Sequence, residues 1–404
     1  MRKPGKPSQY MHDSQLSNIH SIKPEPAFQK SAIEEILGIP FTENNHVRLL
    51  QSGKEIFQTI FDSVTNARHI ICIEFYIFKN DDTGKKLSAL LKEKARQGVS
   101  IYLLYDHFGS FLTSRSFWSD LKKEGIKVRV SHPFKWSALR GYIYRNHKKL
   151  LIIDGNKAFI GGFNIADEYH GYFKKRKKTW RDTGIYLEGQ IASTLLSIFS
   201  KSWRTWKGDL FNLPIRHQFI NHGVPVIPVF MNSRRAGRKT RRLLLYSIKN
   251  AKESIFLTTA YFIPSRKILR ALENAAKKGI NIKLLVPGKS DVTAAFYAGR
   301  SYYNRLLKTG VEIYNYQDAV LHAKTAVFDG CWSIIGSTNL DFQSLRRNEE
   351  SNVGIFDGNF GRQMIEAFES DLHNSIKIDA NTWSKRPFYE KILEKFFSLF
   401  RKRL

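Results

Sequence analysis

Apolar residues along most of the chain follow spacings that alternate between those of helices and those of strands. Residues 54–66 carry apolar side chains at helical spacing, and residues 69–78 form an apolar run typical of a buried strand. A helix at 87–95, a strand at 99–105, a further helix and a strand at 126–130 follow. Alternating helices and strands predict a mainly parallel or mixed sheet that helices cover on both faces.

The same order of elements begins again near Val226. Three pairs of segments align by eye: ARHIICIEFYIF with AKESIFLTTAYFIP, EKARQGVSIYLLYD with ENAAKKGINIKLLVP, and LKKEGIKVRV with LLKTGVEIYNY. Three aligned pairs in the same order indicate an internal repeat. We therefore expect a first domain at 46–214 and a second at 215–375, joined near 215–225.

The N-terminal residues lie outside the repeat. Residues 1–30 contain four Pro and many Ser and Lys residues, a composition typical of a mobile arm. Ser31 and Glu34 have the spacing of a capping box, which predicts a short helix that stops near Gly38. We therefore interpret residues 1–45 as a mobile arm followed by a short helix.

Residues 376–404 predict a basic amphipathic helix at the other end of the chain. Its apolar face lies among Lys and Arg residues and consists of Phe388, Ile392, Leu393, Phe396, Phe397, Leu399 and Phe400. A basic helix rich in Phe suits a membrane interface. The alternative is that this face packs against its own domain, and the sequence leaves both open.

Composition restricts the classes of partner. The 404 residues include 65 Lys plus Arg against 36 Asp plus Glu, a formal net charge of +29 that favours nucleic acid or an anionic membrane surface. No run approaches the roughly 20 apolar residues that a membrane-spanning helix needs, so we expect a cytosolic or peripheral protein. The two Cys residues, Cys72 and Cys331, lie in apolar strand patterns and predict buried free thiols rather than a disulfide or a metal site.

Candidate chemistry gathers in one predicted hairpin, residues 147–164, HKKLLIIDGNKAFIGGFN. His147 and Lys149 are two apart on a strand, so both side chains leave the same face. The Asp154–Gly155 turn folds the next strand back, which brings Asn164 near His147. Residues 322–339 repeat the pattern as HAKTAVFDGCWSIIGSTN, and two such hairpins suggest one shared site.

Written as spacing, both hairpins read H-x-K-x4-D-x6-G-[GS]-x-N. The residues concerned are His147, Lys149, Asp154, Gly161, Gly162 and Asn164, and then His322, Lys324, Asp329, Gly336, Ser337 and Asn339. This spacing resembles the signature of the phospholipase D superfamily, over roughly residues 45–375. RNHKKLLIIDG, GGFNIADEY, WRDT and GSTNLDFQSLRRNEESN are most similar to bacterial cardiolipin synthases, and to the shorter peripheral members rather than those with N-terminal transmembrane helices.

The resemblance implies an α/β fold of two repeated α-β-α sandwich domains related by a pseudo-two-fold axis, with one active site at their interface. It implies that one His attacks phosphorus while the other protonates the leaving alcohol. We favour His147 over His322 as the nucleophile. Phosphodiester transfer also needs cations and amide donors around the developing charge, and the candidates are Lys149, Lys324, Asn164 and Asn339.

A nucleophilic His needs an acceptor on its far nitrogen. The family pattern points to Asp182 and Glu350 for this task, with Glu349 as an alternative to Glu350. The motif residues Asp154 and Asp329 belong to the catalytic signature, but each precedes a Gly, so we expect them to form turns. Further possible substrate contacts are Asp106, His107, Tyr261 and Asp291; for the first two a loop cap is an equal alternative.

The first half contains two insertions that the second lacks, and both are basic. They lie within 133–146 and 164–182 and contribute the candidate lipid or membrane contacts Lys135, Trp136, Arg140, Arg145, Lys174, Lys175, Arg176, Lys177 and Lys178. The alternative for the second cluster is a solvated loop. We expect the first hairpin to face the membrane.

The resemblance implies phosphatidyl transfer from one phosphatidylglycerol to another, giving cardiolipin and glycerol without a metal or other cofactor. Phosphatidylethanolamine is an alternative second substrate. The rival activities are a phospholipase D hydrolase and, favoured only by the charge, a nuclease; we do not expect nucleic acid as a partner. We expect a peripheral protein on the cytoplasmic side of the cell inner membrane.

Overall fold

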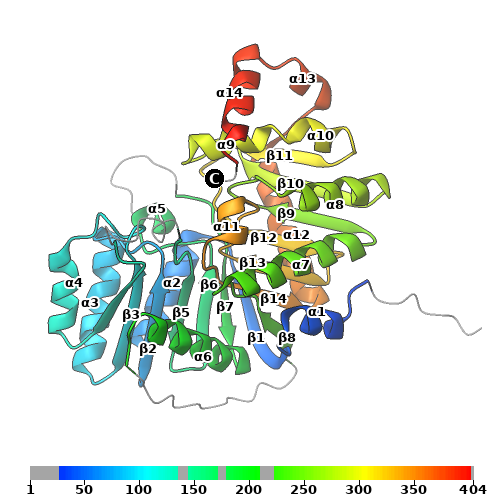
Figure 1. Ribbon diagram of the computed structural model, residues 1–404. Helices are drawn as coiled ribbons and strands as arrows, with labels where there is room; N and C mark the ends of the chain where they lie inside the picture. Colours follow the sequence, from blue (N-terminus) through cyan, green and yellow to red (C-terminus); the bar gives the residue numbers. More distant parts are fainter. Residues whose placement is uncertain (1–26, 135–143, 172–178, 210–222, 402–404) are drawn as a thin grey trace, which may run out of the picture.

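The computed structural model describes residues 27–134, 144–171, 179–209 and 223–401. Fifteen strands in these residues form one sheet, and helices cover both of its faces (Figure 1). The sheet runs β15-β11-β10-β9-β12-β13-β14-β8-β1-β7-β6-β5-β2-β3-β4. The two halves of the chain therefore share a single sheet, joined where β1 pairs antiparallel with β8.

The elements before the join are α1 (Lys30–Leu37), β1 (Thr42–Leu50), α2 (Gly53–Thr65), β2 (Ile70–Phe75), α3 (Asp82–Arg96), β3 (Ser100–Asp106), α4 (Arg115–Lys123), β4 (Lys127–Ser131), β5 (Lys149–Ile153), β6 (Lys157–Gly161), α5 (Asp167–His170), β7 (Gly184–Glu188) and α6 (Gln190–Thr205). Those after it are β8 (Val224–Pro228), α7 (Arg234–Asn250), β9 (Ser254–Thr258), α8 (Arg266–Lys277), β10 (Asn281–Pro287), α9 (Thr293–Arg300), α10 (Tyr303–Leu307), β11 (Glu312–Tyr316), β12 (Thr325–Phe328), β13 (Trp332–Gly336), α11 (Phe342–Arg346), β14 (Asn352–Phe356), α12 (Gly358–His373), β15 (Ser375–Lys377), α13 (Ala380–Ser384) and α14 (Phe388–Leu399).

The two halves have the same strand order when read outward from the join. The first half gives β1-β7-β6-β5-β2-β3-β4, and the second gives β8-β14-β13-β12-β9-β10-β11 with β15 added at its edge. In each half the outer strands pair in parallel: β3 pairs with β2 and β4, and β10 pairs with β9 and β11. The predicted α/β fold of two repeats is confirmed.

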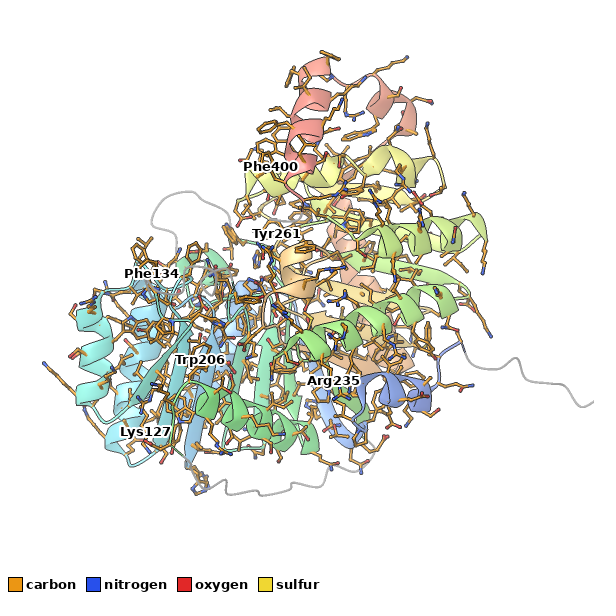
Figure 2. The ribbon with its side chains drawn as sticks, in the orientation of Figure 1. Lys127, Phe134, Trp206, Arg235, Tyr261 and Phe400 are labelled. Carbon is orange, nitrogen blue, oxygen red and sulfur yellow. The ribbon has the colours of Figure 1, made fainter. Side chains whose placement is uncertain are left out.

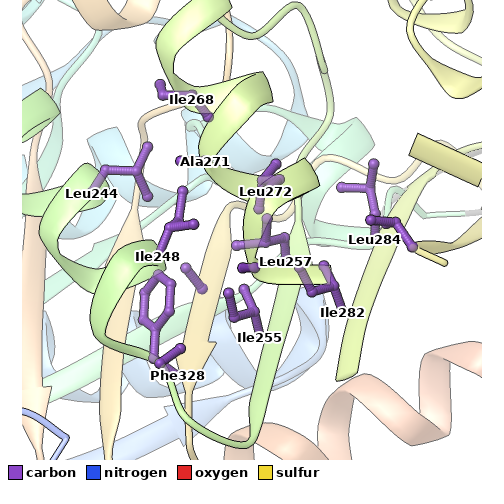
Figure 3. Packing of buried hydrophobic residues seen from close by; sticks show 14 of the residues in the cluster. Leu244, Ile248, Ile255, Leu257, Ile268, Ala271, Leu272, Ile282, Leu284 and Phe328 are labelled. Carbon is purple, nitrogen blue, oxygen red and sulfur yellow. The ribbon is translucent and has the colours of Figure 1, made fainter. Parts of the chain in front are cut away.

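Apolar packing joins the halves into one body. On one face, α6 and α12 bury a cluster that contains strand residues of both halves, such as Leu187 and Val353. On the other face each half has its own cluster, under α2 and α3 in the first half and under α7 and α8 in the second. Figure 3 shows Ile248 of α7 and Leu272 of α8 against Ile255 of β9. Full burial of one Ile or Leu side chain contributes about 1.5–3 kcal/mol to the free energy of unfolding.

The short helix before the repeat begins earlier than its sequence pattern predicts. Helix α1 starts after Gln29, and Ser31 lies inside it, so the capping-box prediction is wrong. The Glu34 carboxylate instead accepts a hydrogen bond from the Phe41 backbone N–H at 2.8 Å. The helix ends at Gly38 as expected, in the left-handed conformation (φ 68°). Phe28 packs into the core of the second half, so the segment that precedes the first repeat packs on the second repeat.

The two motif hairpins have the predicted turns, but their first strands begin at Lys149 and Thr325, so His147, His322 and Lys324 lie just before the strands rather than within them. β5 pairs antiparallel with β6, and β12 with β13. Asp154 and Asp329 are both left-handed, with φ 51° and 48°, and so are the glycines that follow them. Asn and Asp tolerate this conformation better than other residues with a Cβ.

The carboxylates of the motif aspartates tie each hairpin to a neighbouring strand. Asp154 accepts three backbone hydrogen bonds of 2.7–3.0 Å, from residues 68–70 at the start of β2. Asp329 accepts three of 2.9 Å, from residues 252–254 at the start of β9. Both lie at the ends of β5 and β12 remote from Lys149 and Lys324. The sequence signature places them among the catalytic residues, but their contacts are those of turn-forming structural residues.

Replacing Asp154 tests this structural role. We expect Asp154→Ala to lower the free energy of unfolding by about 2–4 kcal/mol, because three charge-assisted hydrogen bonds are lost and Ala disfavours φ > 0. Asp154→Asn should cost less, since it keeps the turn and one acceptor. Urea denaturation measures both. A folded Asp154→Ala protein with unchanged stability and no activity would instead give the carboxylate a catalytic role.

Helix α14 lies against α9 at one end of the molecule (Figure 1). Among the helices of the described residues, none combines the length and the apolar character that crossing a bilayer requires. The apolar face of α14 is divided: Phe397 is partly buried against α9, whereas Phe388 and Leu399 are exposed. The sequence left packing and membrane contact open for this helix, and its structure has one face suited to each.

Candidate active site

A cavity of about 520 Å³ lies between the two halves. The motif residues His147, Asn164, His322 and Asn339 line it, together with side chains of both halves. Figure 2 labels Tyr261, another lining residue, where the two parts of the molecule meet. The two hairpins therefore contribute to one pocket.

Backbone hydrogen bonds across the interface place both His residues. The His147 N–H donates to the Glu349 carbonyl, and the Glu349 N–H donates to the Arg145 carbonyl, each at 2.8 Å. On the other side the His322 N–H donates to the Arg181 carbonyl at 2.8 Å, and Arg181 N–H to Val320 at 2.9 Å. Each His thus lies on a segment that pairs with the acidic segment of the opposite half.

This pairing brings a carboxylate of the opposite half to each imidazole. His147 Nδ1 lies 2.9 Å from Glu350 Oε2, and His322 Nδ1 lies 2.7 Å from Asp182 Oδ2. An ionised carboxylate only accepts hydrogen bonds, so Nδ1 carries the hydrogen and Nε2 keeps its lone pair. The family resemblance indicates these two acids, but it does not show that each one hydrogen-bonds to the His of the other repeat.

The two imidazoles differ in their second neighbour. Lys324 Nζ donates to the His322 carbonyl, which places its charge 2.7 Å from His322 Nδ1. Lys149 Nζ donates to the His147 carbonyl at 2.8 Å. Among the described residues, Glu350 is the one hydrogen-bond partner of the His147 ring. An ammonium group beside the His322 ring makes that imidazole less basic than His147.

The pocket is electrostatically prepared for an anion. Burial lowers the pKa of His147, and it holds the pKa of His322 well below its usual value, helped by the Lys324 charge. Burial also lowers the pKa of Lys324 to about 8 and that of Lys149 well below its usual value. It raises the pKa of Asp182 to about 6. A bound phosphodiester adds a negative charge, which acts to raise the pKa values of the four basic groups.

The motif amides are held by neighbouring polar groups. Asn164 Oδ1 accepts from the Ile77 N–H at 3.1 Å, and Asn164 Nδ2 donates to the Tyr169 hydroxyl at 2.8 Å. Asn339 Oδ1 accepts from the Thr259 hydroxyl at 3.4 Å. With its oxygen facing the protein in this way, each amide keeps N–H capacity for a ligand in the pocket.

The other candidates have different positions. Asp106 caps its loop by accepting from the N–H groups of Phe108 and Gly109, and its other oxygen accepts from the Asn146 N–H at 2.8 Å. It is a loop cap that also positions the residue before His147. Tyr261 and Asp291 do line the pocket, and the Tyr261 hydroxyl donates to the Asp291 carboxylate at 2.8 Å. His107 is not among the residues that line the pocket, and its ring lies 6.3 Å from the Phe111 ring.

One of the predicted membrane contacts lies at the pocket. Arg145 lines it, with its guanidinium 4.1 Å from the centre of the Phe108 ring. The remaining candidates fall outside the described residues: Lys135, Trp136, Arg140, Lys174, Lys175, Arg176, Lys177 and Lys178. Of the two predicted buried thiols, Cys72 is buried and Cys331 is only partly so. Within the described ranges, no His, Cys, Asp and Glu side chains form a group of three that fits a metal ion.

A buried ionic network lies behind the site and was not predicted from the sequence. The fully buried Lys148 contacts Glu74 at 3.0 Å, Ser202 at 3.2 Å, and Glu349. Burial acts to lower the pKa of Lys148, but the carboxylates of Glu349 and Glu74 outweigh it and raise the pKa. The second copy has Ala323 at this position. The difference between HKK in the first copy and HAK in the second could have indicated this network. Side chains alternate along the extended segment that leads into β5, so the middle residue points away from the pocket and into the core.

Gly162 marks a close approach between the halves. A Cβ at this position would lie 2.3 Å from Asp182 Oδ1 and 2.8 Å from the His322 carbonyl oxygen. The matching residue of the second copy, Ser337, has room for a side chain and donates its hydroxyl to Glu350. The motif therefore has Gly where this residue packs directly against Asp182, and Ser where its side chain hydrogen-bonds to Glu350.

Substitution of Gly162 tests this approach. We expect Gly162→Ala to displace Asp182 and lower activity by about 10²-fold, because a shift of about 1 Å at the reacting groups costs that much. The reciprocal Ser337→Ala, which adds no atoms, is the matched control and should cost less. Steady-state turnover with thermal unfolding measures both. Full activity of Gly162→Ala would show that the contact is unimportant.

Comparisons with known proteins agree with this architecture. A family described as "Cardiolipin synthase, PLD-like domain" matches residues 60–203 and 244–372. Cardiolipin synthase 2 of Bacillus anthracis is 36% identical over 87% of this chain and 69% of its own, and the major cardiolipin synthase ClsA of Bacillus subtilis (strain 168) is 34% identical over 88% and 74%. The crystal structure of phosphatidylserine synthase from Haemophilus influenzae Rd KW20 has a TM-score of 0.70 at 14% identity, over 93% of this chain and 100% of its own, which shows a shared fold. The chain belongs to the cardiolipin synthase family of phospholipase D-like proteins.

Proposed function

We propose that this protein is a cardiolipin synthase, which transfers the phosphatidyl group of one phosphatidylglycerol to the hydroxyl of a second and releases glycerol. The observation that carries the proposal is the arrangement of two imidazoles in one pocket, each held by a carboxylate of the opposite half. Membership in the cardiolipin synthase family supports the choice of substrate.

The first half-reaction forms a phosphohistidine. The Nε2 lone pair of His147 attacks phosphorus, the bond from phosphorus to the glycerol oxygen breaks, and His322 gives its Nε2 proton to that oxygen. The bound phosphodiester raises the pKa of His322 so that it holds this proton. In the second half-reaction His322 takes the proton of the acceptor hydroxyl, whose oxygen attacks phosphorus and breaks the bond to His147. Both residues return to their starting state.

The different neighbours of the two rings support His147 as the nucleophile. The Glu350 carboxylate alone on Nδ1 increases the basicity of His147, which favours attack. The Lys324 ammonium next to His322 makes the protonated ring a stronger acid, which favours proton transfer to glycerol. Lys149 and Lys324 then hold the non-bridging oxygens, with Asn164 and Asn339 as amide donors.

Lys324 should set the basic limb of the pH profile. Its pKa is lowered to about 8 by burial, so the charged form that binds phosphate is lost as pH rises through 8. We expect kcat/KM to fall above about pH 8 while kcat falls less, because bound substrate raises this pKa. Lys324→Arg, which stays charged, should move the limb to higher pH at lower overall activity. An unmoved limb in this variant would assign it to another group.

The transferase proposal is tested with phosphatidylglycerol labelled in its phosphate. We expect thin-layer chromatography and mass spectrometry to show labelled cardiolipin and one glycerol per cardiolipin. Phosphatidic acid without cardiolipin would instead indicate a hydrolase. Vesicles that also contain phosphatidylethanolamine show whether this lipid contributes to the product, through release of ethanolamine.

We place the protein at the cytoplasmic face of the cell inner membrane, as a peripheral protein. The net charge of +29 supports contact with anionic lipid. Fractionation of cells measures this: high salt or alkaline carbonate should release the protein from membranes, and retention after both treatments would contradict peripheral attachment.

A further inference from the structure

We propose that two apolar surfaces of this chain seat the pocket mouth in an anionic phospholipid bilayer. The first, the β3 loop, consists of Phe108, Phe111 and Leu112 after strand β3. The second, the outer face of α14, consists of Phe388, Ile392, Phe396 and Leu399, together with Phe400 directly after the helix. This inference rests on the proposed function, because it takes the substrate to be a lipid.

The β3 loop presents large apolar side chains from a well-fixed backbone. Phe111 and Leu112 are 69% and 87% exposed. The loop is held from behind, since the hydroxyls of Ser110 and Thr113 donate to the carbonyls of Tyr76 and Phe78 at 3.2 and 2.6 Å. Phe108 lines the pocket under the Arg145 guanidinium. The loop therefore joins the pocket mouth to an exposed apolar tip.

Helix α14 divides its residues among three faces. Its inner face binds α9: Glu390 and Glu394 pair with Arg300, the second at 3.1 Å. The outer face carries a stripe at helical spacing, in which Phe388 and Leu399 are 76% and 74% exposed. The third face is polar, with Lys391 and Lys395. An apolar stripe beside basic residues is the pattern of a helix that lies in a membrane interface.

The inner face of α14 packs on residues of the pocket wall. Phe397, on the inner face, packs on a cluster that includes Ile263 and Ala295, with Tyr261 beside it. These three residues also line the pocket. In Figure 2, Phe400 of α14 and Phe134 of the first half lie to different sides of Tyr261. The β3 loop, through Phe108, and α14, through Phe397, therefore both adjoin the pocket, one from each half.

A bilayer fits this surface better than a protein partner. The acyl chains of the substrate stay in the membrane while its phosphodiester must reach His147 and His322, so the mouth has to touch the headgroup layer. A protein that covered the mouth would block lipid entry. Arg145 at the mouth and Lys391, Lys395 and Arg401 along α14 add positive charge, which complements anionic lipid.

Binding of the full chain to vesicles tests the proposal. We compare phosphatidylcholine vesicles with and without phosphatidylglycerol for the wild type, Phe111→Ser/Leu112→Ser and Phe396→Ser/Leu399→Ser. Each double variant removes two exposed apolar side chains and should weaken vesicle binding by about 10- to 100-fold. Ile376→Ser, at an exposed apolar residue of the β15 edge strand, is the matched control and should bind like the wild type.

Activity on dispersed lipid separates membrane contact from folding and chemistry. Both double variants should keep turnover of short-chain phosphatidylglycerol below its micelle concentration and lose it on vesicles. Phe111→Trp and Leu399→Trp should show a blue shift of fluorescence on vesicles, and Ile376→Trp should not. Vesicle binding equal to wild type, or equal loss on dispersed lipid, overturns the proposal. The proposal is also overturned if the wild type is a dimer and Phe396→Ser/Leu399→Ser dissociates this dimer without weakening vesicle binding. A wild type that binds vesicles but makes no cardiolipin from either substrate would instead refute the proposed function.

Discussion

We expect His147→Ala and His322→Ala to differ sharply when the leaving group is changed. With phosphatidylglycerol both variants lose activity, by about 10⁴-fold or more for the nucleophile and about 10²–10⁴-fold for the acid. With a 4-nitrophenyl phosphatidyl ester the leaving group departs without a proton. His322→Ala should then release 4-nitrophenolate in a burst, whereas His147→Ala should release none. Stopped-flow absorbance measures this difference.

The burst of His322→Ala should stop after about one equivalent per site, because the second half-reaction still needs a base for the acceptor hydroxyl. His373→Ala, at the exposed end of α12, is the matched control and should turn over like the wild type. A burst from His147→Ala and none from His322→Ala would reverse the assignment of the two residues.

The second large effect concerns the buried Lys148. Lys148→Met leaves the Glu74 and Glu349 carboxylates without their counter-ion in the interior, which should lower the free energy of unfolding by about 3–5 kcal/mol. Because Glu349 also pairs its backbone with His147, the variant should lose activity even where it remains folded. Urea denaturation and turnover below the transition measure the two effects.

Partial rescue distinguishes an ionic cause from lost packing. Lys148→Met/Glu74→Gln removes one of the two unpaired charges and should recover part of the stability. Lys201→Met, on the exposed side of α6, should be close to neutral. If Lys148→Met proved as stable as the wild type, the network would have no structural importance, and the HKK against HAK difference would need another explanation.

The sequence was most informative where a pattern occurs twice. The alternation of helices and strands, its repetition and the Asp-Gly turns predict the sheet, its helical layers and both hairpins, because each depends on local periodicity or on a left-handed turn. The capping box at Ser31 misled, since one spacing of two residues is a weak signal and packing of Phe28 against the second half decided where α1 begins.

The arrangement of the site was harder to predict. The residue types of the motif name the His, Lys, Asn and acid candidates, but the crossing of Asp182 to His322 and of Glu350 to His147 follows from bridges between distant segments, which no periodicity encodes. The same holds for Lys148, whose partners Glu74 and Glu349 lie far from it in sequence. The asymmetry of the two imidazoles also became visible only from the Lys324 contact with His322.

The proposed reaction passes through a covalent phosphatidyl group on His147, which is then transferred to a second lipid. Rapid quench of the wild type with phosphate-labelled phosphatidylglycerol, followed by peptide mass spectrometry, tests it most directly. We predict label on the peptide that contains His147, and its transfer into cardiolipin when unlabelled phosphatidylglycerol is added. Label on the His322 peptide, or cardiolipin formed with no label on the protein at any time, would refute a phosphatidyl intermediate on His147.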